Sequence, residues 1–182
     1  MANKLLKEIN VDEILESFRA NPQRNQELKV LWNDKKIEVN LEYRDFEKEI
    51  NEIREKLENL KILVENAEEW ERKIKDAAGE YILEDARYWW EPSADYEDED
   101  MPGLIADLTE IVGKKEAEKM VNDEELSLES FKKLIYVNSI TLEENGDFTV
   151  SLFDIDELIF SGHIMFVFGN INGKFSNGDF AG

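Results

Sequence analysis

The sequence predicts an α+β protein in which an antiparallel β-sheet packs against central amphipathic helices. Three patterns support this prediction: alternating apolar residues near the N-terminus, a heptad-like repeat in the middle, and two strand–turn–strand patterns near the C-terminus. With 182 residues, of which 42% are hydrophobic, the chain is long enough to bury one core. We expect a helical extension at residues 1–25 and a single α+β domain at residues 26–182.

The N-terminal part predicts one short helix followed by a β-hairpin. Residues 10–20 have helical spacing, and Asn10 with Glu13 three positions later forms a capping pattern. Two runs at 28–32 and 37–43 then alternate apolar and polar residues, and a polar turn separates them. The hairpin and the C-terminal strands together are expected to form the sheet.

The central part predicts two amphipathic helices. Apolar residues from 46 to 67 repeat at alternating steps of four and three: Phe46, Ile50, Ile53, Leu57, Leu60, Val64 and Ala67. Because three heptads are short for a coiled coil, we favour packing of this face on the protein's own sheet over pairing between chains. Asn66 with Glu69 predicts a second capping box and a helix that runs to about Trp90.

The inward face of this second helix is expected to hold Trp70, Ile74, Ala78, Tyr81, Ile82 and Trp89. Adjacent helix positions point about 100° apart, so within the Trp89-Trp90 pair one side chain can lie in the core and the other at an interface.

A loop at 91–103 follows. Further elements are expected as short helices at 104–112 and 117–121, a helical turn opened by Ser127, and strands at 137–142, 148–153, 164–168 and 175–180.

Negative charge is concentrated in one segment. The net charge is −21, and residues 79–130 hold 17 Asp and Glu against 4 Lys and Arg, a net charge of −13. The densest run, Asp95 to Asp100, directly follows the tryptophan pair. Such a surface repels nucleic acids and anionic membranes and attracts a basic protein.

Several classes of protein are excluded or disfavoured by composition. Without cysteine the chain has no disulfide, thiolate metal site or Cys nucleophile. It has no apolar run long enough for a transmembrane helix and no evident signal peptide, so we expect a cytoplasmic protein. The glycines near the C-terminus lie in Asn-Gly turns rather than between a strand and a helix, so no cofactor is expected.

Catalytic and metal sites have weak support. His163 is the only histidine, and a hydroxyl and carboxylates lie near it in sequence: Asp154, Asp156, Glu157 and Ser161. A hydrolase can be imagined from these groups, but we favour a structural role in a tight turn at Gly162, with the imidazole bonded to a carbonyl or carboxylate. The acid run lacks the spaced pattern of a calcium loop, and Asp154 with Asp156 lacks a third ligand, so no metal site is expected.

The C-terminal pattern resembles an uncharacterised bacterial domain-of-unknown-function family. Members of that family typically end in an acidic segment, a Phe-x-Gly-His element, a strand, a Gly-rich turn and Ala-Gly. The matching positions here are Asn145-Gly146-Asp147-Phe148, Asp154 to Leu158, Phe160-Ser161-Gly162-His163, Gly169 to Gly173, and Ala181-Gly182. The resemblance covers roughly residues 28–182, leaves 1–25 outside, and has Ser161 where the family usually has Trp.

This resemblance implies no reaction, although some relatives resemble toxin-immunity proteins, and the acidic character is similar to that of anti-CRISPR proteins. We therefore expect a monomeric, non-enzymatic binding protein that inhibits a basic, nucleic-acid-handling protein by occluding its Lys and Arg surface, as an anti-CRISPR protein would. Toxin immunity and an enzyme using His163 are the alternatives. The expected contact residues are Trp89, Trp90, Asp95, Tyr96, Glu97, Asp98, Glu99, Asp100, Asp123, Glu124 and Glu125, and the expected structural residues are Gly162 and His163.

Overall fold

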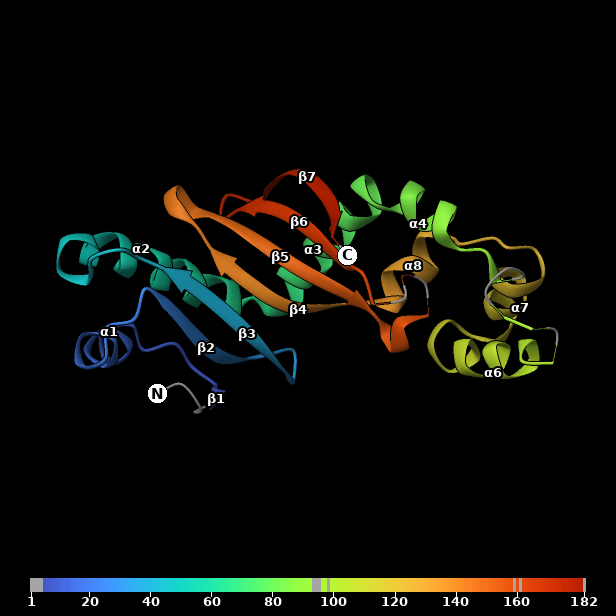
Figure 1. The fold of residues 1–182 in the computed structure, drawn as a ribbon, viewed down its shortest axis with the longest axis horizontal. Coiled ribbons are helices and arrows are strands. Elements are labelled where there is room, and N and C mark those ends of the chain that lie inside the picture. Colours follow the sequence, from blue (N-terminus) through green and yellow to red (C-terminus); the bar gives the residue numbers. More distant parts are fainter. Residues whose placement is uncertain (1–4, 93–95, 98, 159, 161, 182) are drawn as a thin grey trace.

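A seven-stranded, mostly antiparallel sheet forms the centre of the protein (Figure 1). The computed structural model describes residues 5–92, 96–97, 99–158, 160 and 162–181. The strands lie in sequence order across the sheet, which confirms the predicted α+β class. They are β1 (Leu5–Leu6), β2 (Asn25–Trp32), β3 (Lys35–Glu42), β4 (Ile135–Leu142), β5 (Asp147–Asp154), β6 (Ile164–Asn170) and β7 (Lys174–Ala181).

Two of the neighbouring strand pairs are parallel, β1 with β2 and β3 with β4, and the others are antiparallel. The long connection from β3 to β4 contains all the described α-helices except the first, as a parallel pair requires a crossover. The helices are α1 (Val11–Ala20), α2 (Phe46–Glu65), α3 (Ala67–Tyr81), α4 (Leu83–Trp89), α6 (Met101–Val112), α7 (Lys114–Asn122) and α8 (Leu128–Leu134).

The helices that follow β3 are arranged in two groups (Figure 1). Helices α2 and α3 lie behind the sheet in this view, and α4, α6, α7 and α8 gather at one end of the molecule.

Half-buried aromatic side chains alternate with core residues on β4, β5 and β6: Tyr136, Phe153, Phe166 and Phe168. No helix among the described residues is long and apolar enough to cross a membrane.

Helices α1, α2 and α8 begin at residues whose side chains cap the helix, whereas α3, α4, α6 and α7 begin without such a cap among the described residues. The side chain of Asn10 accepts a hydrogen bond from the backbone N–H of Glu13, and that of Ser127 accepts one from Ser130, which confirms both predicted caps. The predicted capping box at Asn66 is wrong. Its side-chain amide instead donates to the carbonyl oxygen of Ile62 at 2.9 Å, so it bonds back to the end of α2.

The heptad-like face of α2 packs inside the same chain. Ile53, Leu57 and Leu60 are fully buried, whereas Ile50 and Val64 lie at the margin of the core. Each fully buried side chain of this size stabilises the fold by about 1.5–3 kcal/mol relative to an exposed one. The predicted intramolecular packing is therefore confirmed.

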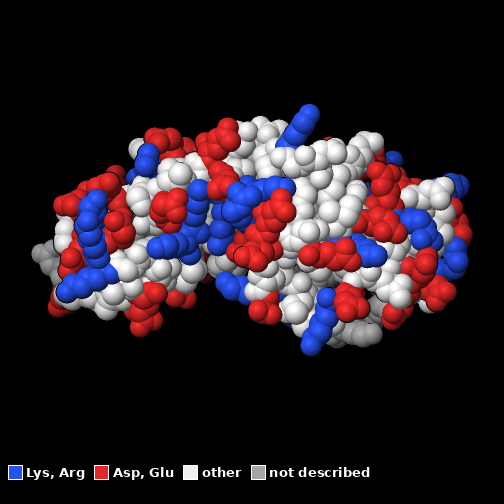
Figure 2. Space-filling model, turned by 180° about the vertical axis from the view of Figure 1, so that it is seen from behind, with Lys and Arg blue, Asp and Glu red and all other residues white. Residues whose placement is uncertain are grey.

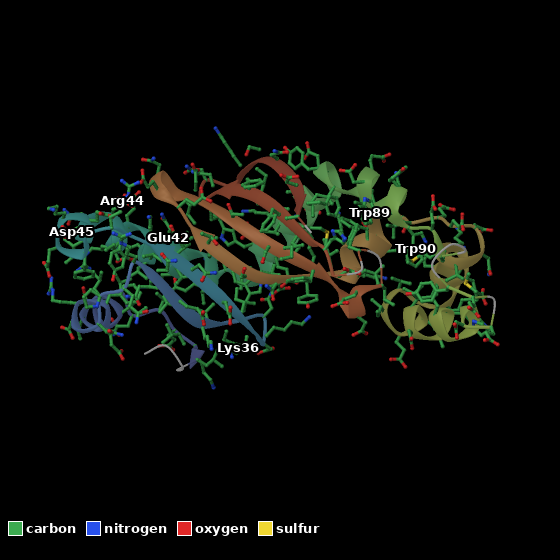
Figure 3. The ribbon with its side chains drawn as sticks, viewed as in Figure 1. Lys36, Glu42, Arg44, Asp45, Trp89 and Trp90 are labelled. Carbon is green, nitrogen blue, oxygen red and sulfur yellow. The ribbon has the colours of Figure 1, made fainter. Side chains whose placement is uncertain are left out.

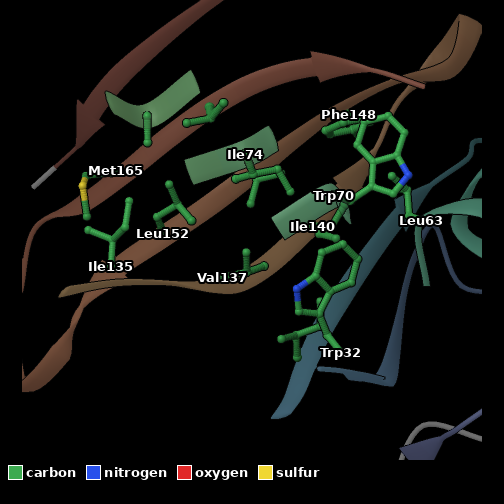
Figure 4. Close-up of a cluster of buried hydrophobic side chains, with 14 of the residues drawn as sticks. Trp32, Leu63, Trp70, Ile74, Ile135, Val137, Ile140, Phe148, Leu152 and Met165 are labelled. Carbon is green, nitrogen blue, oxygen red and sulfur yellow. The ribbon is translucent and has the colours of Figure 1, made fainter. Parts of the chain in front are cut away.

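The core between α3 and the sheet is built around two tryptophans (Figure 4). The Trp70 ring meets that of Phe148 edge to face with centroids 5.7 Å apart, and Ile74 is completely buried beside it. Trp32 enters the same core from the sheet, and its indole N–H donates to the carboxylate of Glu71 on α3 at 3.1 Å. The sheet and α3 are thus joined by both apolar packing and a polar contact.

The predicted helix from 66 to about 90 is two helices, which changes the position of Trp89. Ile82 separates α3 from α4, so the residues after it do not continue the helical period of α3. As a result Trp89 is 43% exposed, and the expectation that it points inward is wrong. Trp90 is only 3% exposed, so the pair does divide between core and surface.

Candidate functional site

The acidic segment folds into a helical lobe at one end of the molecule. We call the described residues between Leu83 and Glu125 the acidic lobe. Its apolar side chains form its own part of the core: Leu83, Ala86, Trp90, Leu104, Leu108, Val112, Ala117, Met120 and Val121. The charged residues therefore lie on a folded body.

Two hydrogen bonds fasten α4 to the rest of the lobe. The indole N–H of Trp90 donates to the carbonyl oxygen of Met120 at 2.8 Å, and this bond is buried. The guanidinium of Arg87 donates to the carbonyl oxygen of Leu126 at 3.0 Å and pairs with Glu84 at 2.7 Å. These contacts fix the outer face of α4 relative to α7.

The junction between α3 and α4 is held against the edge of the sheet. A Cβ atom added to Gly178 on β7 would lie 2.7 Å from Ile82 and 3.0 Å from the Cβ of Tyr81. Only glycine allows this approach of strand and helix. The hydroxyl of Tyr81 also donates to the carbonyl oxygen of Phe175 at 3.2 Å. The sheet thus supplies a rigid support for α4.

Most carboxylates of the acidic lobe have no cationic partner. The ion pairs in the lobe are Glu84–Arg87, Glu118–Lys114 and Glu125–Lys119, the last two at 3.8 and 3.9 Å. Other carboxylates form no ion pair with any residue that the structure describes: Asp85, Glu91, Glu97, Glu99, Asp100, Asp107, Glu110, Glu116 and Asp123. Nearly all of these are exposed. The lobe therefore has a strongly negative potential.

The charge pattern of α2 and α3 is different. Lysines one helical turn from carboxylates form pairs there, as in Lys56–Glu52, Lys73–Glu69 and Lys75–Glu71, at 2.7 to 3.1 Å. On the face seen from behind the sheet, acidic and basic side chains are interspersed (Figure 2). The uneven distribution of charge lies instead along the sequence, because residues 79–130 hold 17 Asp and Glu against 4 Lys and Arg.

The predicted contact residues are divided between surface, core and undescribed positions. Glu97, Glu99, Asp100, Asp123, Glu124 and Glu125 are exposed, and Tyr96 is half-buried and packs against the core. Asp95 and Asp98 lie outside the described residues. Trp90 is buried, and its indole N–H donates a hydrogen bond to the carbonyl oxygen of Met120 in the interior. A partner therefore cannot contact this side chain.

The structure brings Trp89 and His163 together, which sequence reasoning treated separately. Their ring centroids lie 4.8 Å apart with planes inclined by 58°. His163 follows Gly162 (φ +85°), and its backbone N–H donates to the carbonyl oxygen of Phe160 at 2.9 Å. The imidazole forms no hydrogen bond with another described residue, so the contact expected with a carbonyl or carboxylate is replaced by the Trp89 ring.

Sequence reasoning missed Tyr88. This side chain is 80% exposed and precedes Trp89 on α4 (Figure 3 labels Trp89 and Trp90). One signal in the sequence could have found it. Tyr88 lies three positions after Asp85, and residues at i and i+3 share one face of a helix. Two adjacent aromatic side chains are therefore accessible beside unpaired carboxylates.

The residues of the hydrolase alternative do not form a catalytic arrangement among the described groups. Asp154 is 2% exposed, and its Oδ2 accepts the backbone N–H of Phe160 at 3.3 Å, which holds the connection before β6. Asp156 and Glu157 are exposed and have left-handed backbone angles. Ser161 lies outside the described residues. Within the described part, no group of three or more His, Asp or Glu side chains is arranged to hold a metal ion.

A large groove lies away from the acidic lobe. It has a volume of about 1060 Å³ and opens where the parallel strands β3 and β4 end, near Glu42 and Arg44 (Figure 3). Lys56, only 6% exposed, donates there to the carbonyl oxygen of Glu42 at 3.2 Å and pairs with Glu52 at 2.7 Å. The groove is thus lined by mixed charges whose buried cation is already paired.

Comparison with known families gives one match. The model of a family described as "uncharacterized protein conserved in bacteria (DUF2262)" matches residues 12–180. The matched range begins within α1, earlier than the residue 28 expected from the C-terminal pattern. No curated protein and no solved structure matches the chain.

Proposed function

The chain belongs to this family of uncharacterised bacterial proteins, and we propose that it acts as a non-enzymatic acidic binding protein that inhibits a basic, nucleic-acid-handling protein. Carboxylates of the acidic lobe would pair with Lys and Arg groups that otherwise hold phosphates of the nucleic acid. Inhibition would result from occlusion of that basic surface.

The observation that carries this proposal is the set of exposed carboxylates on the folded acidic lobe that form no ion pair with another described residue. Single exposed ion pairs contribute only about 0–1 kcal/mol, so charge by itself gives little affinity per pair. A field of unpaired carboxylates does accelerate association with a basic partner and excludes acidic ones. A slow dissociation of the complex then requires buried contacts, and aromatic residues at the centre of an interface commonly supply them.

The partner class that we propose is an RNA-guided nuclease, which makes the protein an anti-CRISPR inhibitor. Such a nuclease holds its nucleic acid in a positively charged channel, which a negatively charged lobe complements. Immunity to a basic toxin is the alternative, because it needs the same acidic surface. The two differ in whether inhibition depends on the guide RNA of the partner.

A charge-reversal experiment tests the proposal. The lobe variant Glu97→Lys/Glu99→Lys/Asp100→Lys is compared with the control Glu55→Lys/Glu58→Lys/Glu68→Lys, which changes the net charge equally at exposed positions on α2 and α3. Proteins captured from bacterial lysate are identified and purified, and their binding is measured at about 0.1 and 0.5 M salt, where screening differs strongly.

The proposal predicts a basic nucleic-acid-binding partner whose affinity falls with salt and with the lobe variant but not with the control. Nuclease assays of that partner with and without guide RNA then separate the anti-CRISPR function from toxin immunity. Equal loss of binding in both variants would contradict a role for the lobe, because only total charge would matter. A partner that is acidic or insensitive to salt would contradict the whole proposal.

A further inference from the structure

The outer face of α4 carries an aromatic pair beside a carboxylate. Asp85, Tyr88 and Trp89 occupy positions i, i+3 and i+4, so their side chains share one face of the helix. Tyr88 is 80% and Trp89 43% exposed, and Asp85 is exposed and forms no ion pair with a described residue. The three side chains therefore present two ring systems and an unpaired negative charge to solvent.

This face is held in place before any partner arrives. Trp90 anchors the end of α4 through its buried bond to Met120, and His163 supports the Trp89 ring with centroids 4.8 Å apart. The nearest cation on the helix, Arg87, is occupied by Glu84 and by the carbonyl oxygen of Leu126. No internal cation among the described residues therefore lies over the Trp89 ring, whereas Trp70 and Phe46 each have one over theirs.

We infer that Asp85, Tyr88 and Trp89 form a docking point for an arginine side chain of the basic partner. This inference rests on the proposed function and makes it more specific. The guanidinium would stack on the exposed aromatic surface while it pairs with the Asp85 carboxylate. Charge complementarity identifies the occupant as a cation, and the aromatic surface beside the carboxylate selects arginine among cations.

The chemistry of the two basic side chains explains that selection. Guanidinium is planar, weakly hydrated and able to donate two parallel hydrogen bonds to a carboxylate while its face lies on an aromatic ring. The lysine ammonium is a compact and strongly hydrated charge, so it gains less from such a surface. At an exposed site, a cation–π contact is worth about two- to fivefold in affinity, so arginine gains up to that factor over a lysine that does not stack on the ring.

Two synthetic peptides of equal length, oligoarginine and oligolysine, test the inference. Their affinities are measured by calorimetry for the wild type and for Trp89→Leu, Trp89→Phe and Asp85→Asn. Tyr136→Leu is the control, because Tyr136 is an accessible aromatic on the sheet that already has Lys35 over its ring at 5.3 Å. Urea unfolding shows that each variant is folded, and Trp89→Phe retains a ring if the leucine variant does not fold.

The measured quantity is the ratio of the oligoarginine to the oligolysine affinity. We expect Trp89→Leu to lower this ratio about twofold, Asp85→Asn to lower it as well, and Tyr136→Leu to leave it unchanged. An unchanged ratio in Trp89→Leu overturns the inference. Equal affinities of the wild type for both peptides would also overturn it while leaving the proposed function standing, whereas binding of neither peptide would overturn both.

Discussion

The indole N–H of Trp90 donates a buried hydrogen bond of 2.8 Å to the carbonyl oxygen of Met120, and this bond fastens the end of α4 to α7. Its neighbour Trp89 lies on the outside against His163. Two consecutive tryptophans thus have different roles: one holds the acidic lobe together, and the other is available to a partner. The difference can be measured in the free protein.

Trp90→Phe should destabilise the protein by about 2 kcal/mol, because it removes apolar volume and leaves the Met120 carbonyl without its donor. Trp89→Phe should change the free energy of unfolding by less than about 0.5 kcal/mol, since that side chain is largely at the surface. Urea denaturation of both variants checks this. Equal losses of stability would show that Trp89 also belongs to the core.

The features that the sequence predicted correctly are local ones. The cap at Asn10, the cap at Ser127 and the apolar face of α2 depend on residues within one or two helical turns, so pattern and capping chemistry determine them. The strands β2 to β7 were also expected, because alternation and Asn-Gly turns mark them, whereas the short β1 was not. The acidic lobe was located by its charge alone.

The features that it missed depend on contacts between distant segments. The position of Trp89 follows from the helix break at Ile82, which sits against Gly178 on β7. Asn66 fits a capping pattern, yet its amide bonds to Ile62 in the preceding helix. The parallel pairing of β3 with β4 joins segments separated by the long helical connection, and no local pattern predicts it.

Stability should depend on the ionisation of Glu71. Its carboxylate is partly buried, which alone would raise the pKa, but hydrogen bonds from Asn33, Lys75 and Trp32 and the charge of Lys75 outweigh burial and lower the pKa. A carboxyl group whose pKa is lower in the folded state contributes stability above its unfolded pKa of about 4.3 and loses it as the pH falls through the folded value.

Glu71→Gln should therefore be less stable than the wild type at pH 7, and the difference should shrink in acid as the wild-type carboxylate becomes protonated. Chemical denaturation from about pH 7 to below pH 4 tests this. Glu80→Gln is the matched control on the same helix, because Glu80 is exposed and forms no ion pair with a described residue. A difference for Glu71→Gln that stays constant with pH would refute the electrostatic explanation.

Gly162 should resist substitution because its φ of +85° lies in the left-handed region. Gly162→Ala should cost about 1–2 kcal/mol, since a Cβ atom is unfavourable at such a φ. Gly103→Ala in α6 is the control: no atom lies within 4 Å of the added Cβ, and alanine should stabilise the helix by up to about 1 kcal/mol. Thermal unfolding measures both, and equal signs would be inconsistent with this explanation.

The outer strand of the sheet carries its own protection against pairing with other chains. β7 is the last strand in the sheet order, so one side of it has no neighbouring strand among the residues that the structure describes. The side chain of Asn177 accepts the backbone N–H of Gly178, and that of Asp179 accepts the N–H of Phe180, both at 2.8 Å. Donors that a foreign strand would need are thus already engaged.

Asn177→Thr/Asp179→Thr should therefore increase self-association, because the variant loses both side-chain acceptors and one negative charge while gaining strand propensity. Light scattering over a range of protein concentrations measures the effect. Asn40→Thr/Glu38→Thr is the control, since it makes the same kind of change on the interior strand β3, where both positions are paired with β2 on one side and β4 on the other. Equal self-association of the two variants would attribute the effect to lost charge rather than to the freed edge of β7.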